Sequence, residues 1–136
     1  MSAELTPGVG AATSWSRQEE WLSLALESAD LGIWEWDLLT GVTIRSARHD
    51  QMFGYAAPQP GWGLEAAAHH VLPEDRAVLR HAFADAAAGV DVEFEVRVRA
   101  PEGSIRWIRS RGRVRHDVTG RPVRVIGVVS DITAQR

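Results

Sequence analysis

The feature that most constrains the fold is a strict alternation of apolar and charged residues in the last third of the chain. The apolar positions are Val92, Phe94, Val96 and Val98, and every residue between them is glutamate or arginine. A period of two is typical of a β-strand with one buried face. Pro101-Glu102-Gly103 follows closely and favours a three-residue hairpin loop with glycine at the bulge position. The sequence therefore predicts an antiparallel hairpin that begins at Val92.

The loop also predicts which residues face one another, because it places Ala100 opposite Ser104. On the apolar side, the expected pairs are Val96 with Ile108, Phe94 with Ser110, and Val92 with Gly112. On the polar side, they are Glu95 with Arg109 and Glu93 with Arg111. A slip of one residue would set Phe94 against an arginine, so the pattern specifies the register strongly.

The remaining elements follow from helical spacing and turn residues. Ser16 and Glu19 form a capping-box pair at the start of a helix over 16–29. We expect strands over 33–38, 42–46 and 123–130, short helices over 48–53 and 64–70, and a longer helix from Pro73 to the residue before Gly89. Two strands followed much later by three favour an α+β fold, in which one five-stranded antiparallel sheet carries helices on one face.

A chain of 136 residues fits one domain. We expect a flexible tail over 1–13, an N-terminal capping helix over 14–30, a core over 31–133, and over 134–136 the start of a linker. The absence of cysteine excludes disulfides, thiolate metal sites and cysteinyl adducts. No apolar run approaches the ~20 residues of a membrane span, and the N-terminus lacks a secretion signal. We therefore expect a cytoplasmic protein without direct membrane contact.

Charge is distributed unevenly along the chain. All fifteen basic residues are arginine, and ten of them lie from residue 97 onward together with only three acidic residues. A basic row on one strand face could hold a phosphate backbone; it consists of Arg109, Arg111, Arg113 and Arg115, next to Trp107. In the predicted register, two of these four arginines face glutamates of the neighbouring strand. The net charge of the chain is −3. We expect no nucleic-acid partner and keep nucleic-acid binding as the third functional hypothesis.

Six stretches, in this order, resemble the PAS domains that end in a PAC-type motif. They are Leu31-Gly-Ile-Trp-Glu-Trp-Asp-Leu, Met52-Phe-Gly-Tyr, Leu72-Pro-Glu-Asp-Arg, Gly103-Ser-Ile-Arg-Trp-Ile, Gly120-Arg-Pro and Gly127-Val-Val-Ser-Asp-Ile-Thr. The resemblance spans about residues 22–133 and implies a five-stranded sheet, helices over one face, and a pocket between them. It also implies sensing and dimerisation in front of an output domain, typically a histidine kinase, a diguanylate cyclase or a transcription regulator.

The resemblance raises the question of a cofactor, and the residues disfavour both common ones. Flavin-binding members form a light-driven adduct with a cysteine and carry a glutamine two residues after the glycine of the last strand. This chain has no cysteine, and Val129 stands at the glutamine position. Haem-binding members use a histidine near the long helix, but His81 lies opposite the apolar stripe of that helix, so it points to solvent. The other histidines lack metal-ligand spacing, and His69 and His70 are expected at the surface.

The inner face of the sheet offers either a packed core or a ligand pocket. The pocket residues would be Trp34, Trp36, Phe94, Ile108, Ser110, Gly112, Val125 and Val129. Ser110 and Gly112 are small, so they leave space on that wall. Core packing is the favoured interpretation of the tryptophans, and a small-molecule pocket is the alternative.

The end of the last strand is the expected exit for a signal. In the resembling family, Asp131-Ile132-Thr133 joins the sheet to the helix that drives the output domain. Asp131 and Thr133 carry oxygens that can cap a following helix, and Ile132 can anchor the joint apolarly. Arginines of the neighbouring strand are expected to pair with Asp131.

No nucleophile elbow, metalloprotease helix or Walker loop is present, so we expect no catalytic site. The expected function is a sensory or relay domain of a signal-transduction protein of the histidine kinase (two-component) or diguanylate cyclase type. The alternative is a ligand-free dimerisation module. A homodimer is expected because Trp15 and Trp21 add apolar surface to the helix over 16–29. That helix should pack on the outer sheet face or against a second protomer.

Overall fold

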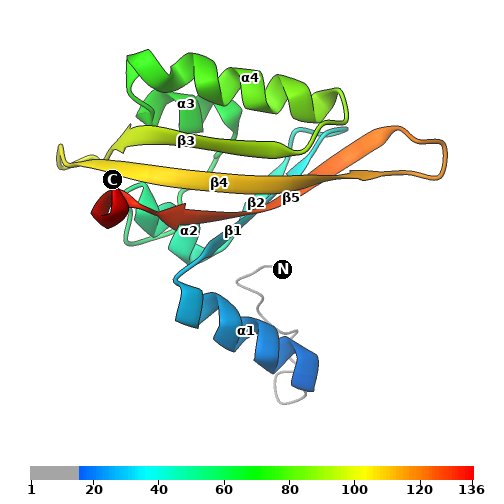
Figure 1. The fold of residues 1–136 in the computed structure, drawn as a ribbon, viewed down its shortest axis with the longest axis horizontal. Helices are drawn as coiled ribbons and strands as arrows, with labels where there is room; N and C mark the ends of the chain where they lie inside the picture. Colours follow the sequence, from blue (N-terminus) through cyan, green and yellow to red (C-terminus); the bar gives the residue numbers. More distant parts are fainter. Residues whose placement is uncertain (1–15) are drawn as a thin grey trace.

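The computed structural model describes residues 16–136, and its centre is a five-stranded sheet in the order β2-β1-β5-β4-β3 (Figure 1). The strands are β1 (Gly32–Asp37), β2 (Thr43–Arg45), β3 (Val92–Arg99), β4 (Ile105–His116) and β5 (Pro122–Asp131). All neighbouring strands are antiparallel. The pairing of β1 with β5 joins the two early strands to the three late ones, and this confirms the predicted α+β fold.

The β3–β4 hairpin has the predicted register at every pair. Gly103 adopts a φ of +103°, which glycine tolerates without strain. Its N–H donates to the carbonyl of Ala100 (2.8 Å), and the N–H of Ala100 donates to the carbonyl of Ser104 (2.9 Å). The resulting partners are Val92 and Gly112, Glu93 and Arg111, Phe94 and Ser110, Glu95 and Arg109, and Val96 and Ile108.

Helices cover the inner face of this sheet. They are α2 (Ala47–Met52), α3 (Leu64–His70), the 3-10 helix η2 (Pro73–Asp75) and α4 (Arg76–Ala87). α4 contacts β3, and α2 contacts β1 and β5. The first turn after Pro73 is 3-10 rather than α-helical, and Asp75 directs its carboxylate to the guanidinium of Arg97 (2.8 Å) instead of capping α4.

The core between sheet and helices is organised around Trp34. Its indole lies against two glycines of neighbouring strands, because a Cβ atom at Gly112 would stand 2.7 Å from the ring and one at Gly127 would stand closer still. Its Nε1 donates to Ser110 Oγ (2.9 Å). The fully buried apolar side chains around it include Met52, Val71, Val96, Val98, Val125 and Val129.

α1 (Arg17–Ala29) begins as predicted and projects away from the sheet (Figure 1). Ser16 Oγ accepts from Glu19 N (3.0 Å), and Glu19 Oε1 accepts from Ser16 N (2.8 Å), which completes the capping box. No residue of α1 is buried among the described residues. Only Leu22 and Leu26 border a groove against the outer sheet face. The predicted tail over 1–13 and Trp15 lie outside the described residues.

The chain ends in η3 (Thr133–Gln135), a short 3-10 helix. Residues 134–136, the expected start of a linker, thus lie within and just after this turn. Among residues 16–136, no helix combines the length and the apolar character that a membrane crossing requires.

Candidate functional site

A cavity of about 60 Å³ lies between the inner sheet face and the helices. The sheet contributes Trp34, Phe94, Val96, Ile108, Ser110 and Val129. The helices and the loop before α3 contribute His49, Phe53, Trp62, Ala67, Val71 and Leu79. Five of the eight predicted pocket residues therefore meet at one cavity, namely Trp34, Phe94, Ile108, Ser110 and Val129.

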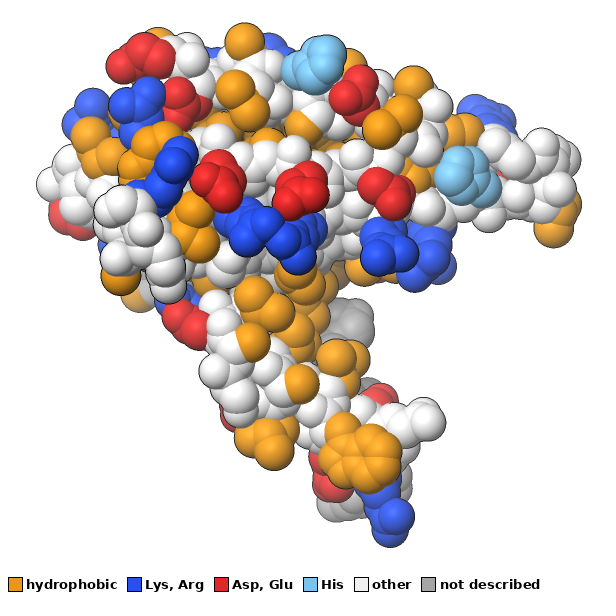
Figure 2. Space-filling view, viewed as in Figure 1, with side chains coloured by type: hydrophobic (Ala, Val, Ile, Leu, Met, Phe, Trp, Pro, Cys, Tyr) orange, Lys and Arg blue, Asp and Glu red, His pale blue; other side chains and the backbone are white. Residues whose placement is uncertain are grey.

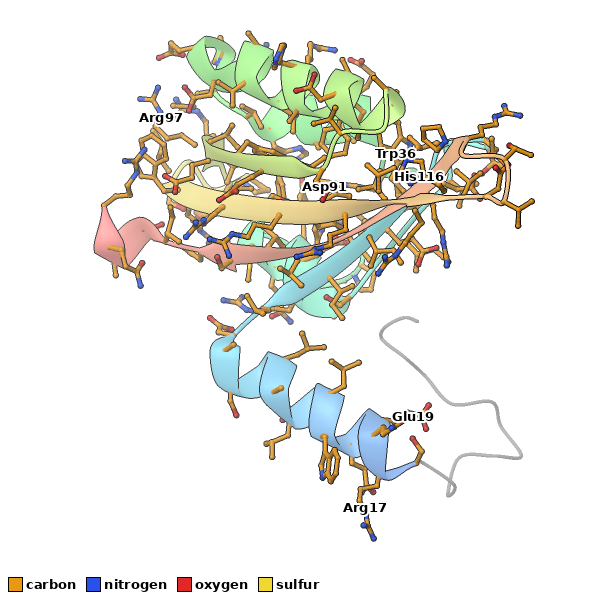
Figure 3. All side chains as sticks on the ribbon, turned by 45° about the vertical axis from the view of Figure 1, so that its right-hand side comes forward. Arg17, Glu19, Trp36, Asp91, Arg97 and His116 are labelled. Atoms are coloured by element: carbon orange, nitrogen blue, oxygen red, sulfur yellow. The ribbon has the colours of Figure 1, made fainter. Side chains whose placement is uncertain are left out.

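The other three predicted pocket residues lie elsewhere. The ring of Trp36 packs edge-on against Phe83, with the ring centroids 5.0 Å apart. Trp36 lies at the end of the sheet that is far from Arg97 (Figure 3). Val125 is part of the packed core, and Gly112 faces the indole of Trp34. The indole of Trp34 fills the space expected beside Gly112, whereas Ser110 lines the cavity.

Two polar residues of the cavity wall, Arg45 and His49, are held in place by Asp50 behind them, whose side chain is only 2% exposed. Arg45 donates to it from Nε (3.1 Å) and Nη2 (2.9 Å), His49 from Nδ1 (2.8 Å), and the backbone N–H of Gln59 at 2.8 Å. Arg45 Nη2 also donates to the carbonyl of Gln59 (2.6 Å). These bonds tie β2, α2 and the loop before α3 into one unit.

Electrostatics fixes the protonation state of this unit. Burial alone would raise the pKa of Asp50, but the hydrogen bonds from His49, Arg45 and Gln59 outweigh burial and hold that pKa well below its usual value. Burial lowers the pKa of His49, and the hydrogen bond to Asp50 opposes this only partly. At neutral pH, Asp50 is therefore an anion and His49 a neutral ring whose Nδ1 carries the proton.

Aromatic rings form the remainder of the wall. Phe53 stacks on His49 (centroids 5.0 Å apart), and Trp62 stands edge-on to both rings at 5.0 and 5.7 Å. The carbonyl of Trp62 accepts from Thr43 Oγ1 (2.6 Å), which holds the loop over the cavity. His70 lies beside Trp62, donates from Nδ1 to the carbonyl of Ala66 (2.7 Å) and accepts at Nε2 from Tyr55 Oη (2.6 Å). It is half-buried rather than at the surface as expected.

Sequence reasoning missed Arg45, His49, Asp50 and Trp62 as site residues. None of them belongs to an alternating strand or to an apolar helical stripe, which were the patterns used. One signal was available, because Trp62 is a large aromatic residue in a loop rich in proline and glycine. The Asp50 cluster joins residues of a strand, a helix and a loop, and no spacing rule connects these.

The exit at Asp131-Ile132-Thr133 is held by hydrogen bonds to β4. Asp131 Oδ1 accepts from the N–H of Thr133 (2.9 Å) and from its hydroxyl (2.5 Å). Ile132 N donates to the carbonyl of Trp107 (2.9 Å), and Trp107 N donates to Thr133 Oγ1 (3.0 Å). Among residues 16–136, Asp131 forms no ion pair, and the available arginines of the neighbouring strand, Arg109 and Arg111, pair with Glu93. The carboxylate of Asp131 caps the turn instead.

The indole ring of Trp107 packs against the end of the chain. The guanidinium of Arg136 lies 3.8 Å from the centre of its ring, and that of Arg97 lies 5.3 Å from it. Both distances fall within the range of cation–π attraction. Arg136 also approaches Glu95 (3.5 Å).

The outer sheet face carries the charged ladder that the register predicted. Arg109 and Arg111 approach Glu93 at 3.1 and 3.4 Å, and Arg109 Nε approaches Glu95 at 3.9 Å. Figure 2 shows the acidic and basic rows side by side on this face. The basic row is thus partly neutralised by ordinary cross-strand pairs.

The long helix α4 carries one histidine, His81. His81 is 80% exposed and pairs with Asp85 (3.5 Å), so it points to solvent as predicted. Within the described residues, no three potential metal ligands cluster.

Comparison with known proteins agrees with this architecture. The family model described as PAS fold matches residues 42–129. A blue-light-activated histidine kinase of Brucella anthropi is 26% identical over 121 residues, which are 88% of this chain and 24% of that protein. The chain thus spans about a quarter of the length of the curated relatives it matches.

Two solved structures share the fold. A sensory box histidine kinase/response regulator from Burkholderia thailandensis has a TM-score of 0.67 and 29% identity, over 84% of this chain and 86% of that one. The N-terminal domain of a diguanylate cyclase with PAS/PAC sensor from Marinobacter aquaeolei has a TM-score of 0.69 and 26% identity, over 77% and 97%. The family match covers well over half of the sequence, from the turn before β2 into β5, and the sheet has the expected strands. This chain therefore belongs to the PAS fold family.

Proposed function

We propose that this chain is a sensory domain of a signal-transduction protein, and that it binds a small molecule in the cavity beside Trp62 and His49. The observation that carries the proposal is the cavity itself, whose wall combines aromatic rings with a buried, neutral histidine. Pockets of this kind, mostly apolar with a few placed polar groups, are typical of small-molecule sites.

A short path connects this cavity to the exit. Ile108 lines the cavity and is the register partner of Asp131 across the β4–β5 ladder. Trp107, the preceding residue, holds Ile132 and Thr133 through its backbone. A ligand that displaces Ile108 would therefore shift the strand pair that carries the exit, and such a contact can act as a two-state element.

The output would be a histidine kinase or a diguanylate cyclase, because the similar proteins carry those names. We propose a homodimer that forms through α1, most of whose apolar side chains are exposed among the described residues. Trp21 and Leu24 are 63% and 62% exposed. The arginines of the outer sheet face pair in part with glutamates of the neighbouring strand, so nucleic acid is not part of the proposal.

Flavin and haem are not part of the proposal either. The chain has no cysteine for an adduct, and a cavity of about 60 Å³ is far smaller than either cofactor. We expect the purified protein to be colourless. Flavin or Soret absorption near one equivalent per chain would contradict this.

The proposal can be tested with the 136-residue chain by NMR of its indole N–H groups. Small neutral molecules that bind in the cavity should shift the Trp34 and Trp62 signals saturably and also shift Trp107 at the exit. Ala67→Leu should abolish both shifts by filling the cavity, whereas Ala84→Leu on the exposed face of α4 should leave them intact. Binders that move the cavity signals but never Trp107 would contradict the relay.

The second candidate function is a ligand-free dimerisation module. The small cavity and the exposed apolar side chains of α1 favour it. It predicts strong self-association together with no saturable binder in the same NMR screen.

A further inference from the structure

His49 supplies a hydrogen-bond acceptor in the wall of the cavity. His49 is 6% exposed, and its Nδ1 donates to the carboxylate of Asp50 at 2.8 Å. Nε2 is then a lone-pair acceptor. Among residues 16–136, no group donates to Nε2, and Arg109 Nε is the only fully enclosed side-chain N or O atom without a hydrogen-bond partner. His49 Nε2 therefore keeps access to the cavity space.

Ser110 supplies the complementary group on the opposite wall. Its Oγ accepts from Trp34 Nε1 at 2.9 Å, and its own hydroxyl hydrogen has no acceptor among the described residues. Ser110 is buried and lines the same cavity. The site thus offers an acceptor on α2 and a donor on β4, in a mostly apolar and aromatic wall that also includes Glu35, Thr43 and Arg45.

The charges around the cavity are already paired. Arg45 forms a bidentate pair with Asp50, and Glu35 approaches Arg124 at 3.5 Å. A charged ligand would lose its hydration without gaining a free counter-ion, which is costly in an apolar site. The ligand is therefore uncharged.

The volume limits the size of the ligand. A cavity of roughly 150 Å³ is needed to hold benzene, and this one has about 60 Å³. Small side-chain movements are needed even for a five-membered ring. The edge-on packing of Trp62 against Phe53 and His49 leaves ring edges and faces as the contact surface, which suits a flat molecule.

We propose that the cavity binds a small, uncharged, planar heterocycle whose N–H or O–H group donates to His49 Nε2. This inference rests on the proposed sensory function and names the chemical class that the site selects. A ligand of about five heavy atoms binds at best in the micromolar range, so the expected affinities are micromolar to millimolar.

The test compares pyrrole with furan, two five-membered rings of nearly equal size that differ in the N–H donor. Each is titrated into the 136-residue chain while the indole N–H signals of Trp34 and Trp62 are followed. Pyrrole should bind at least about tenfold more tightly than furan. Furan has no N–H donor, so it leaves the buried acceptor His49 Nε2 either unpaired or hydrogen-bonded to a trapped water. His49→Phe should reduce this preference to below about twofold, and His81→Phe, at an exposed position, should preserve it.

Each outcome decides a specific point. Equal binding of pyrrole and furan would overturn the role of His49 Nε2 while leaving the cavity as a ligand site. Absence of binding by either ring would overturn the ligand class, and the relay would still stand if other fragments shift Trp107 in the broader screen. If His49→Phe does not fold, the pyrrole-to-furan ratio on the wild-type chain still decides the inference.

Discussion

Asp50 accepts four hydrogen bonds at a position that solvent barely reaches. Asp50→Asn removes the charge that pairs with Arg45 and leaves that guanidinium buried without a partner. We expect a loss of unfolding free energy of about 3 kcal/mol, typical of breaking one side of a buried pair. Asp85→Asn, at a largely exposed carboxylate, is the control and should cost less than about 0.5 kcal/mol. Urea unfolding of the three proteins measures both, and a near-zero effect at Asp50 would contradict the central role of this residue.

The same substitution has a predicted pH dependence. The pKa of Asp50 is lower in the folded than in the unfolded state, so its stabilising contribution is complete above the unfolded value of roughly 3.9. It is lost as the pH falls through the folded pKa. The stability difference between wild type and Asp50→Asn should therefore be constant from about pH 8 to pH 5 and shrink only below about pH 4. A difference that disappears near pH 6 would contradict this assignment.

Gly127 is the second residue whose role can be measured. A Cβ atom there would lie 2.5 Å from the carbonyl oxygen of Arg111 and closer still to Trp34. Because one neighbour is backbone, we expect Gly127→Ala to cost about 2 kcal/mol or more. Gly63→Ala is the control, since a Cβ atom at Gly63 meets nothing within 4 Å and its backbone is extended. Thermal unfolding distinguishes them, and equal melting temperatures would contradict the close fit of the indole.

Among the elements, α1 is the one whose environment is incomplete in this chain. None of its residues is buried, although it carries Trp21, Leu22, Leu24 and Leu26. We expect deletion of residues 1–28 to weaken self-association, because the helix supplies apolar surface for a second protomer. Trp21→Glu with Leu24→Glu should do the same without shortening the chain, and Glu20→Gln on the same helix should not. A full-length chain that sediments as a monomer at high concentration would contradict the dimer.

The elements that sequence reasoning predicted well are those whose determinants are local. The hairpin register followed from Gly103 and the alternation after Val92, and the start of α1 followed from Ser16 and Glu19. The position of α1 could not be predicted this way, because an apolar stripe does not say which surface covers it. The first turn of the helix after Pro73 differed because Asp75 found a partner in Arg97, far away in sequence.

At the scale of the whole molecule, the cavity was only partly predictable. The strand pattern identified which side chains face inward, so Trp34, Phe94, Ile108, Ser110 and Val129 were found. The strand pattern could not show that the indole of Trp34 packs against Gly112 and Gly127 and fills the space expected there. The polar wall arises from contacts between α2, β2 and the loop before α3, and such contacts depend on the assembled fold.

Coupling between the cavity and the exit is the last property of the whole molecule that can be tested. Asp131 accepts from the N–H and hydroxyl of Thr133, which in turn accepts from Trp107, the neighbour of the cavity residue Ile108. Asp131→Ala removes the two bonds to Thr133 and should cost about 1 kcal/mol of stability, as for a lost cap. We further expect that cavity binders still shift the Trp34 and Trp62 signals in this variant but no longer shift Trp107.

Asp117→Ala is the matched control for Asp131→Ala. Asp117 also accepts from a threonine hydroxyl and from backbone N–H groups, but in the turn between β4 and β5, far from the exit. It should lower stability similarly and leave the shift of Trp107 unchanged, because the strand pair of Ile108 and Asp131 is intact. In a complete protein with its output domain, Asp131→Ala should likewise uncouple output from stimulus while the domain remains folded. Normal regulation with a slightly lowered melting temperature would show that Asp131 is a structural cap and that the signal leaves the sheet by another contact.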